Sequence, residues 1–146
     1  MSRDVNFGII YRLCGWVLFA ATIVLVTPNE ARAAQPEIVA SIAALNSGNW
    51  GSYPVLTLSS YYAGGSAGGG TLVYMPSDTT SATDSCVIFL DNAGHRFYRQ
   101  LSGKTLDVTM CGAHWDNATD DASAINAAYV AANRIGSALS CPGGTG

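Results

Sequence analysis

The sequence predicts a small α+β fold in which a short helix is followed by several short strands and a longer C-terminal helix. Three observations support this prediction. Sixteen glycines among 146 residues, with many Ser, Thr and Asn residues, indicate frequent turns. Residues 50–112 contain short β-branched and aromatic runs typical of strands. Residues 120–137 carry apolar side chains at helical spacing.

The composition excludes several classes of protein. The formal charge is −3 and the pI is about 5.0, so the chain lacks the basic surface that nucleic-acid binding requires. Apolar residues make up 49% of the chain and charged residues 12%, a balance that excludes intrinsic disorder and a coiled coil. We therefore expect about one globular domain and no nucleic-acid partner.

Residues 1–33 have the pattern of a secretory signal peptide. Arg3 and Arg12 precede the uncharged apolar run 13–27, and Ala31-Arg32-Ala33 supplies a small-x-small cleavage site. The alternative is an uncleaved membrane anchor, but the run is shorter than the roughly 20 residues of a typical span. We expect cleavage after Ala33, an extracellular or periplasmic location, and no stable membrane span afterwards.

The next part of the chain is predicted to form a short helix and then strands. Pro36-Glu37 begins a helical pattern with Ile38, Ile42 and Leu45 on one side, and Asn46-Ser47-Gly48 ends it. The glycine-rich segment 64–70 lacks the Gly-Lys-Ser/Thr of a phosphate loop and is expected to connect two strands flexibly. The predicted strands are 55–58, 71–75, 105–110, and a hairpin of 86–90 with 95–101 around the turn 91–94.

A second helix is predicted from about Asp120 to Ser137. Thr119, Asp120 and Asp121 supply a hydroxyl and two carboxylates to cap its first turn. The apolar side chains expected to pack on a β core are Ile125, Ala128, Tyr129, Ala132 and Ile135.

The cysteines of an exported chain favour a disulfide. Cys111 precedes the second helix and Cys141 follows it, so a bridge between them would join both ends of the helix and leave Cys86 over. Loop-closure entropy gives such a bridge roughly 3 kcal/mol. The alternative is a zinc site, because Cys111-x-x-His114 has half-site spacing, but a second close pair of ligands is missing.

Residues 112–128 resemble the opening coil of the pectate lyase superfamily. That opening reads like GAxGDGxTDDTAAIQAA, and the matching residues of this chain include Gly112, Ala113, Asp116, Thr119, Asp120, Asp121 and Ile125. Trp115 and Asn117 replace the two loop glycines. Because Trp cannot adopt positive φ cheaply, we expect the loop to have altered geometry.

Upstream residues are similar to a leader that precedes the β-helix in secreted polysaccharide-degrading enzymes and phage tailspikes. The similarity rests on Ser60-Tyr61-Tyr62-Ala63-Gly64, the run 78–84 and Gly94-His95-Arg96-Phe97. It implies a β-rich leader module over 34–104, followed over 105–146 by the capping helix and first coil of a truncated right-handed parallel β-helix. The matched motif residues are then structural. The family's catalytic coils lie later, so we assign no catalytic, cofactor-binding or metal-binding residue, and Ca²⁺ only to a parent protein.

Two functions follow from this resemblance. The first is the N-terminal portion of a secreted polysaccharide lyase or glycoside hydrolase, inactive alone because the active-site coils are missing. The alternative is a non-catalytic module for attachment, oligomerisation or carbohydrate contact. The aromatic residues that could stack on sugars are Tyr61, Tyr62, Tyr74, Phe97 and Tyr98, although aromatic residues of strands more often belong to the core. Both imply polysaccharide as the partner. An unpaired coil edge also favours self-association.

Overall fold

A computed structural model describes residues 36–142. The predicted signal peptide, 1–33, and the final residues 143–146 lie outside this range. Within it, no helix is both long enough and apolar enough to cross a membrane.

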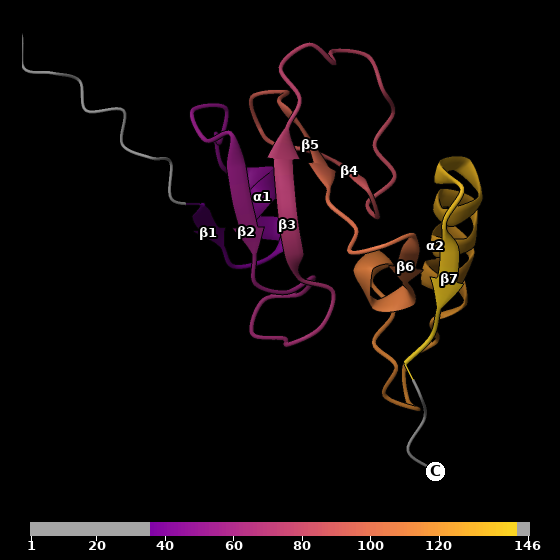
Figure 1. Cartoon of the computed structure of the whole chain (residues 1–146). Coiled ribbons are helices and arrows are strands. Elements are labelled where there is room, and N and C mark those ends of the chain that lie inside the picture. Colours follow the sequence, from indigo (N-terminus) through magenta and orange to yellow (C-terminus); the bar gives the residue numbers. More distant parts are fainter. Residues whose placement is uncertain (1–35, 143–146) are drawn as a thin grey trace, which may run out of the picture. The chain divides into compact units, whose positions relative to one another are not determined.

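The N-terminal part of the described chain forms one mixed sheet of five strands in the order β1-β2-β3-β5-β4 (Figure 1). The strands are β1 (Glu37–Val39), β2 (Val55–Leu58), β3 (Gly70–Tyr74), β4 (Ile88–Leu90) and β5 (Arg96–Arg99). β1 pairs with β2 in parallel, and all other neighbours are antiparallel. The structure therefore confirms the predicted strand 55–58 and the hairpin, with shorter bounds for the hairpin strands.

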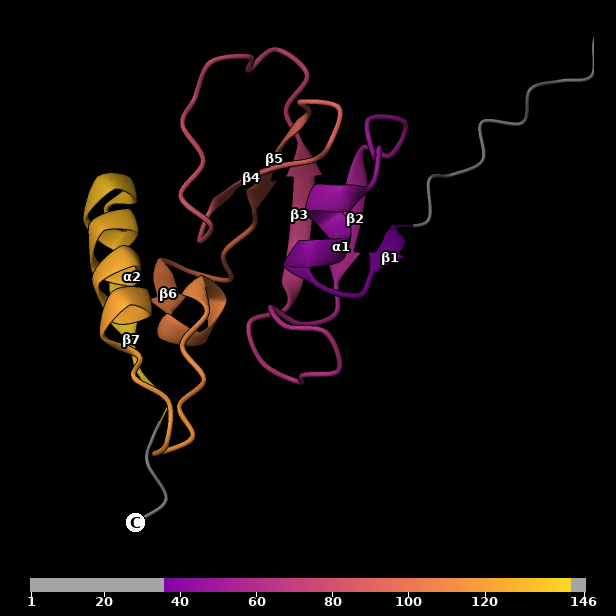
Figure 2. The same ribbon diagram turned by 180° about the vertical axis from the view of Figure 1, so that it is seen from behind.

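Helix α1 (Ile42–Ser47) covers one face of this sheet (Figure 2). Alternate strand residues point toward α1 because successive side chains of a strand face opposite sides. The resulting core contains Ile42 and Leu45 of α1 together with Leu56, Leu58, Leu72, Phe89 and Phe97 of the sheet. These side chains are all buried, and their removal from water stabilises the leader region.

The first helix begins later than the sequence predicts. Ser41 is its N-cap, and its hydroxyl accepts the amide of Ala44 at 3.2 Å. The preceding residues form β1 instead, where Ile38 is opposite Thr57 of β2 and is 68% exposed. Long-range pairing with β2 thus outweighs the local helical spacing.

The turn between β4 and β5 is organised by one buried carboxylate. Asp91 accepts the backbone amides of Trp50 at 2.8 Å, Ala93 at 2.9 Å and His95 at 2.8 Å, and it also contacts Nδ1 of His95 at 2.8 Å. These bonds fix the hairpin turn and join it to the segment after α1. The hairpin is therefore stabilised both by hydrogen bonds within its turn and by the bond from the Trp50 amide outside it.

The C-terminal part contains a second, two-stranded sheet. β6 (Thr105–Asp107) pairs in parallel with β7 (Ala138–Ser140), and the short 3₁₀ helix η1 (Val108–Cys111) and helix α2 (Ala122–Ile135) lie between them in the chain. The predicted strand 105–110 thus ends early, and β7 was not predicted. Among residues 36–142, the fold is α+β as predicted, and no β-helix coil is seen.

Helix α2 buries only part of the predicted stripe: Ala128, Ala132 and Ile125 pack on the core as predicted, but the packed face is shifted away from Tyr129 and Ile135. Its buried residues are Ala128, Ala131 and Ala132, whereas Tyr129 is 63% exposed and Ile135 is also exposed. The prediction that Tyr129 and Ile135 pack on the core was therefore wrong. Small alanines face the core because the helix packs closely on η1 and β6.

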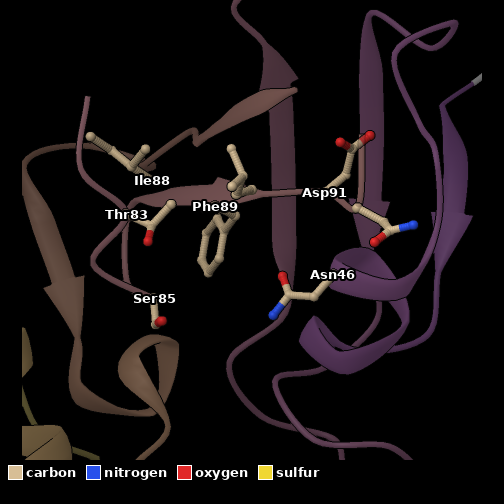
Figure 3. A pocket seen from close by; sticks show the side chains of 8 residues that line it. Asn46, Thr83, Ser85, Ile88, Phe89 and Asp91 are labelled. Atoms are coloured by element: carbon tan, nitrogen blue, oxygen red, sulfur yellow. The ribbon is translucent and has the colours of Figure 1, made fainter. Parts of the chain in front are cut away.

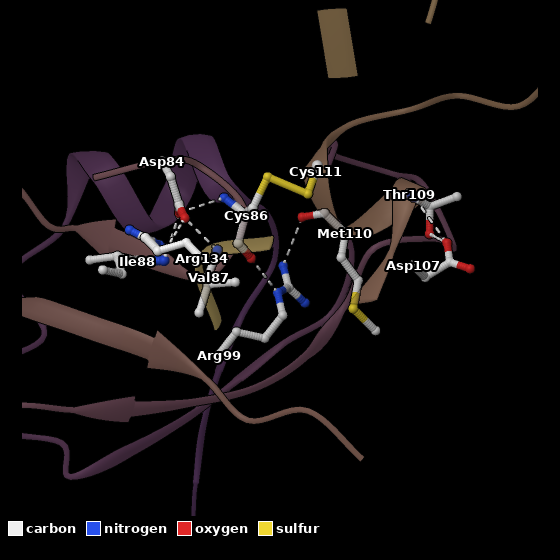
Figure 4. Close-up of a disulfide and its surroundings, with 10 residues drawn as sticks. All are labelled: Asp84, Cys86, Val87, Ile88, Arg99, Asp107, Thr109, Met110, Cys111 and Arg134. Atoms are coloured by element: carbon white, nitrogen blue, oxygen red, sulfur yellow. Dashed lines mark hydrogen bonds and ion pairs between the residues drawn. A yellow bond between two sulfur atoms is a disulfide. The ribbon is translucent and has the colours of Figure 1, made fainter. Parts of the chain in front are cut away.

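The disulfide differs from the predicted one. Cys86 is bonded to Cys111, with 4.3 Å between their Cα atoms (Figure 4). Cys141 is free and exposed. Cys86 and Cys111 belong to the hydrophobic cluster that includes Leu106, Val108 and the α2 alanines. Cys141 follows the last pair of the β6–β7 ladder and lies outside that cluster. The predicted Cys111–Cys141 bridge is wrong because tertiary packing, not the flanking of one helix, decides which cysteines meet.

A buried arginine holds three segments together beside this disulfide. The guanidinium of Arg99 donates to the carbonyls of Cys86 at 2.8 Å and Met110 at 3.3 Å (Figure 4). It also donates to the carbonyl of Gly69 at 2.5 Å and lies over the ring of Phe89. Burial lowers the pKa of Arg99 to about 10. The glycine-rich segment is therefore anchored to the core rather than flexible as predicted.

Candidate functional site

The residues of the predicted motif lie between η1 and the first turns of α2. Gly112 caps η1 with φ of 95°, and a Cβ at this position would lie 2.8 Å from the ring of Tyr61. Ala113 is buried, and Ile125 packs partly against the same cluster. Gly112 is thus required by its conformation and by the close approach of an aromatic ring.

The loop that follows adopts left-handed conformations at two non-glycine residues. Trp115 has φ of 56° and Asn117 has φ of 59°. These are the two positions at which the resemblance places glycine. The expectation that Trp115 avoids positive φ is wrong, so this residue retains backbone strain.

All three carboxylates of the loop accept backbone amides. The carboxylate of Asp116 accepts the backbone amide of Ala118 at 3.0 Å and that of Thr119 at 2.7 Å. It also accepts the hydroxyl of Thr119 at 2.9 Å. These bonds, led by the Thr119 amide, lower the pKa of Asp116 to about 2. Asp120 accepts the amide of Ala122 at 3.0 Å.

Asp121 differs from the predicted helix cap. It is the N-cap residue of α2, but its side chain makes no cap bond to the helix. Its oxygens instead accept the amides of His114 and Trp115, each at 2.8 Å. Asp121 therefore fixes the preceding loop. In the described part of the chain, no group of three or more Asp, Glu, His or Cys side chains is placed to hold a metal ion.

An aromatic pair joins this loop to the leader region. The rings of Tyr62 and His114 are stacked, with centroids 4.3 Å apart and planes inclined by 19°. The hydroxyl of Tyr62 donates to the carbonyl of Gly112 at 2.8 Å. Two surface hollows, of about 440 and 350 Å³, both include Tyr61, Tyr62 and His114 in their walls. The sequence did not indicate this stack, because no local motif joins Tyr62 to His114.

Another hollow, of about 390 Å³, lies beside β4 (Figure 3). Figure 3 shows Phe89 between Thr83 and Ser85 on one side and Asn46 on the other. The one ionisable side chain in its wall is Asp91, and that carboxylate is occupied by the amides of the hairpin turn. This hollow therefore offers little chemistry beyond hydrogen bonding.

Comparison with known families identifies the leader region. Residues 38–102 match the phage tail protein small four-stranded β-sheet domain. No curated protein matches the sequence.

Comparison with solved structures gives several similar chains. The enzymatically active domain of tailspike protein 4 of bacteriophage CBA120 is 29% identical with a TM-score of 0.54, over 72% of this chain and 14% of that chain. WceF of Pantoea stewartii, a glycan biofilm modifying enzyme with a bacteriophage tailspike-like parallel β-helix fold, is 26% identical with a TM-score of 0.59, over 70% and 15%. The tailspike protein of Acinetobacter phage vB_ApiP_P1 is 28% identical with a TM-score of 0.54, over 72% and 18%.

These similarities concern a small part of each relative. The chain covers less than one fifth of each of the three structures. Residues 38–102 thus match a phage tail small β-sheet domain, and the chain has structural similarity, at modest identity, to the N-terminal region of tailspike proteins.

Proposed function

We propose that this chain serves as a non-catalytic N-terminal module of tailspike type, which attaches or positions a polysaccharide-binding protein. The observation that carries the proposal is the match of residues 38–102 to the phage tail small β-sheet domain. The hydrophobic core of the sheet and the hydrogen bonds of Arg99 support the proposal, because they hold the strands and loops of the module together.

The carboxylates of the loop support a non-catalytic role. Glycoside hydrolysis uses two carboxyl groups set across a sugar at a fixed separation. Asp116, Asp120 and Asp121 each accept backbone amides of their own loop or helix start. Their role in this proposal is to shape the connection between the sheet and α2.

The finer fold assignment is part of the proposal. We assign the chain to the N-terminal region of a pectate-lyase-superfamily protein, with β6, α2 and β7 as the start of a right-handed parallel β-helix. The parallel pairing of β6 with β7 through the connection containing α2 is compatible with such a start. Residues 1–33 would direct export, and polysaccharide would be the partner outside the cell.

A second candidate is the leader of a secreted polysaccharide lyase or glycoside hydrolase. The similarity to WceF favours it, since that protein is a glycan biofilm modifying enzyme. In this case the chain itself still carries no active site, and catalysis belongs to later coils of a longer protein. Any Ca²⁺ would likewise belong to that protein.

Self-association is also part of the proposal. Tyr129 and Val130 are large apolar residues of α2 that are more than half exposed, and the β6–β7 pair leaves strand edges without a neighbour in the described chain. We expect oligomers by light scattering after size-exclusion chromatography, and a shift toward monomer in Tyr129→Ser. Unchanged oligomers in this variant would contradict a role for α2.

The proposal is tested by activity and by export. The purified chain is incubated with pectin and related polysaccharides, and unsaturated products and reducing ends are followed. We expect no turnover; turnover that Asp116→Ala or Asp120→Ala abolishes would overturn the non-catalytic role. N-terminal sequencing of exported chain should begin at Ala34, and cytoplasmic material that begins at Met1 would contradict export.

A further inference from the structure

The stacked pair of Tyr62 and His114 lies in the walls of two hollows at the junction of the leader region and α2. The larger hollow, of about 440 Å³, also includes Ser85, Asp120 and Ser123, and the smaller one, of about 350 Å³, includes the glycine-rich loop. Aromatic rings and hydroxyl groups therefore meet at one surface.

The rings are fixed before any ligand arrives. Tyr62 is anchored by its hydrogen bond to Gly112, and the backbone of His114 by its hydrogen bond to Asp121. Tyr61 contacts Tyr62 edge-on, with centroids 4.9 Å apart. Tyr62 nevertheless remains 44% exposed, and the His114 side chain 40% exposed. Preorganised aromatic surface lowers the entropic cost of binding.

Backbone strain gathers at the same place. Among residues 36–142, the non-glycine residues with left-handed φ are Ser85, Trp115 and Asn117. Ser85 is in the wall of the larger hollow, Trp115 follows His114 directly, and Asn117 belongs to the same loop. Strain of this kind persists where the surrounding structure holds it, and it is concentrated at ligand sites.

We propose that this surface, formed by Tyr62, His114, Asp120 and Ser123, binds a neutral saccharide. The apolar face of a sugar ring suits the exposed aromatic surface, and its hydroxyls suit the Ser123 hydroxyl and the second oxygen of Asp120, whose Oδ1 already accepts Ala122. The inference rests on the proposed function, because it names the carbohydrate that the module contacts.

The charges around the hollow select against acidic sugars. Asp84, Asp120 and Asp121 line the larger hollow. The two arginines nearby are already engaged, Arg134 with Asp84 and the buried Arg99 with three backbone carbonyls, and His114 lies 3.7 Å from Asp121. A uronate carboxylate would therefore meet excess negative charge, whereas a neutral sugar would not.

The test is an NMR titration of the isotopically labelled chain with neutral tetrasaccharides of gluco, galacto and manno type, and with tetragalacturonate. We expect saturable shifts at the amides of His114 and Trp115 with at least one neutral tetrasaccharide, and weaker binding of tetragalacturonate. His114→Ala should weaken binding about tenfold, whereas Ile38→Ala, which removes an exposed apolar side chain of β1 far from the hollows in the sequence, should leave it unchanged. Tyr62→Phe retains the ring but removes the hydrogen bond to Gly112, so it should weaken binding less than His114→Ala does.

Three results would overturn the saccharide site: no saturable shift up to ~10 mM neutral sugar, an equal loss of binding in His114→Ala and Ile38→Ala, or tighter binding of tetragalacturonate. Retained amide dispersion in His114→Ala shows that a loss of binding is not unfolding. The proposed function fails on different evidence, namely polysaccharide turnover by the chain. A chain that neither binds neutral sugar nor turns over polysaccharide refutes only the saccharide site.

Discussion

Removing the Cys86–Cys111 disulfide should destabilise the chain by about 3.5 kcal/mol. The two cysteines are separated by 25 residues, and the loop-closure entropy of a cross-link across that distance gives this value at 25 °C. The perturbation is the double variant Cys86→Ala/Cys111→Ala, because both side chains are buried and a lone thiol would remain in either single variant. The exposed Cys141 provides the matched control, Cys141→Ala.

The assay is denaturant unfolding of the oxidised chain, followed by far-UV circular dichroism, with non-reducing peptide mapping of the same sample. For the double variant we expect a lower denaturant midpoint and a large loss in the free energy of unfolding. For Cys141→Ala we expect almost no change in either quantity. Mapping should recover Cys86 and Cys111 in one linked peptide. A loss below about 1 kcal/mol in the double variant, or an equal loss in Cys141→Ala, would refute the reasoning.

Three other perturbations test the remaining features. Arg99→Met should lower the free energy of unfolding by about 3 kcal/mol in denaturant melts, because three backbone carbonyls lose a charged donor. An unchanged free energy of unfolding would mean that the cost of desolvating the guanidinium equals the gain from its hydrogen bonds. Burial raises the pKa of Asp91, but the Trp50 amide and the His95 ring and amide outweigh it, so that pKa lies below its ordinary value of 3.8. Stability should therefore be complete above pH 3.8 and fall below it, and Asp91→Asn should flatten this slope in acid titrations. Trp115→Gly should be about 1 kcal/mol more stable than Trp115→Ala by thermal melting, since alanine retains the left-handed strain; the reverse order would place Trp115 in an ordinary conformation.

Local sequence patterns predicted the elements whose stability is local. The strand 55–58 is β-branched and apolar, and the hairpin contains the turn 91–94, so both were recognisable. β1 and β7 were missed because each has three residues and depends on a parallel partner far away in the chain. The spacing of Ile38 in β1 and Ile42 in α1 also fitted one continuous helix.

The candidate site was predictable only in part. The resemblance indicated the carboxylates of the loop, and their hydrogen bonds are local, within seven residues. The stack of Tyr62 on His114 and the bonding of Cys86 to Cys111 join segments that only the folded chain brings together. Sequence spacing contains no information on such contacts unless a known motif records them.

The position of the disulfide also determines how the chain would carry a pulling force. The bridge joins Cys86 directly to Cys111, so tension applied to the two ends passes through the sulfur atoms and bypasses the residues between them. β4, β5 and β6 lie entirely in this bypassed segment, and Arg99 lies there too. A chain of that length would otherwise lengthen by roughly 85 Å when stretched. With the bridge intact, tension along the chain passes through β1, β2 and β3, and β5 is loaded only through its hydrogen bonds to β3.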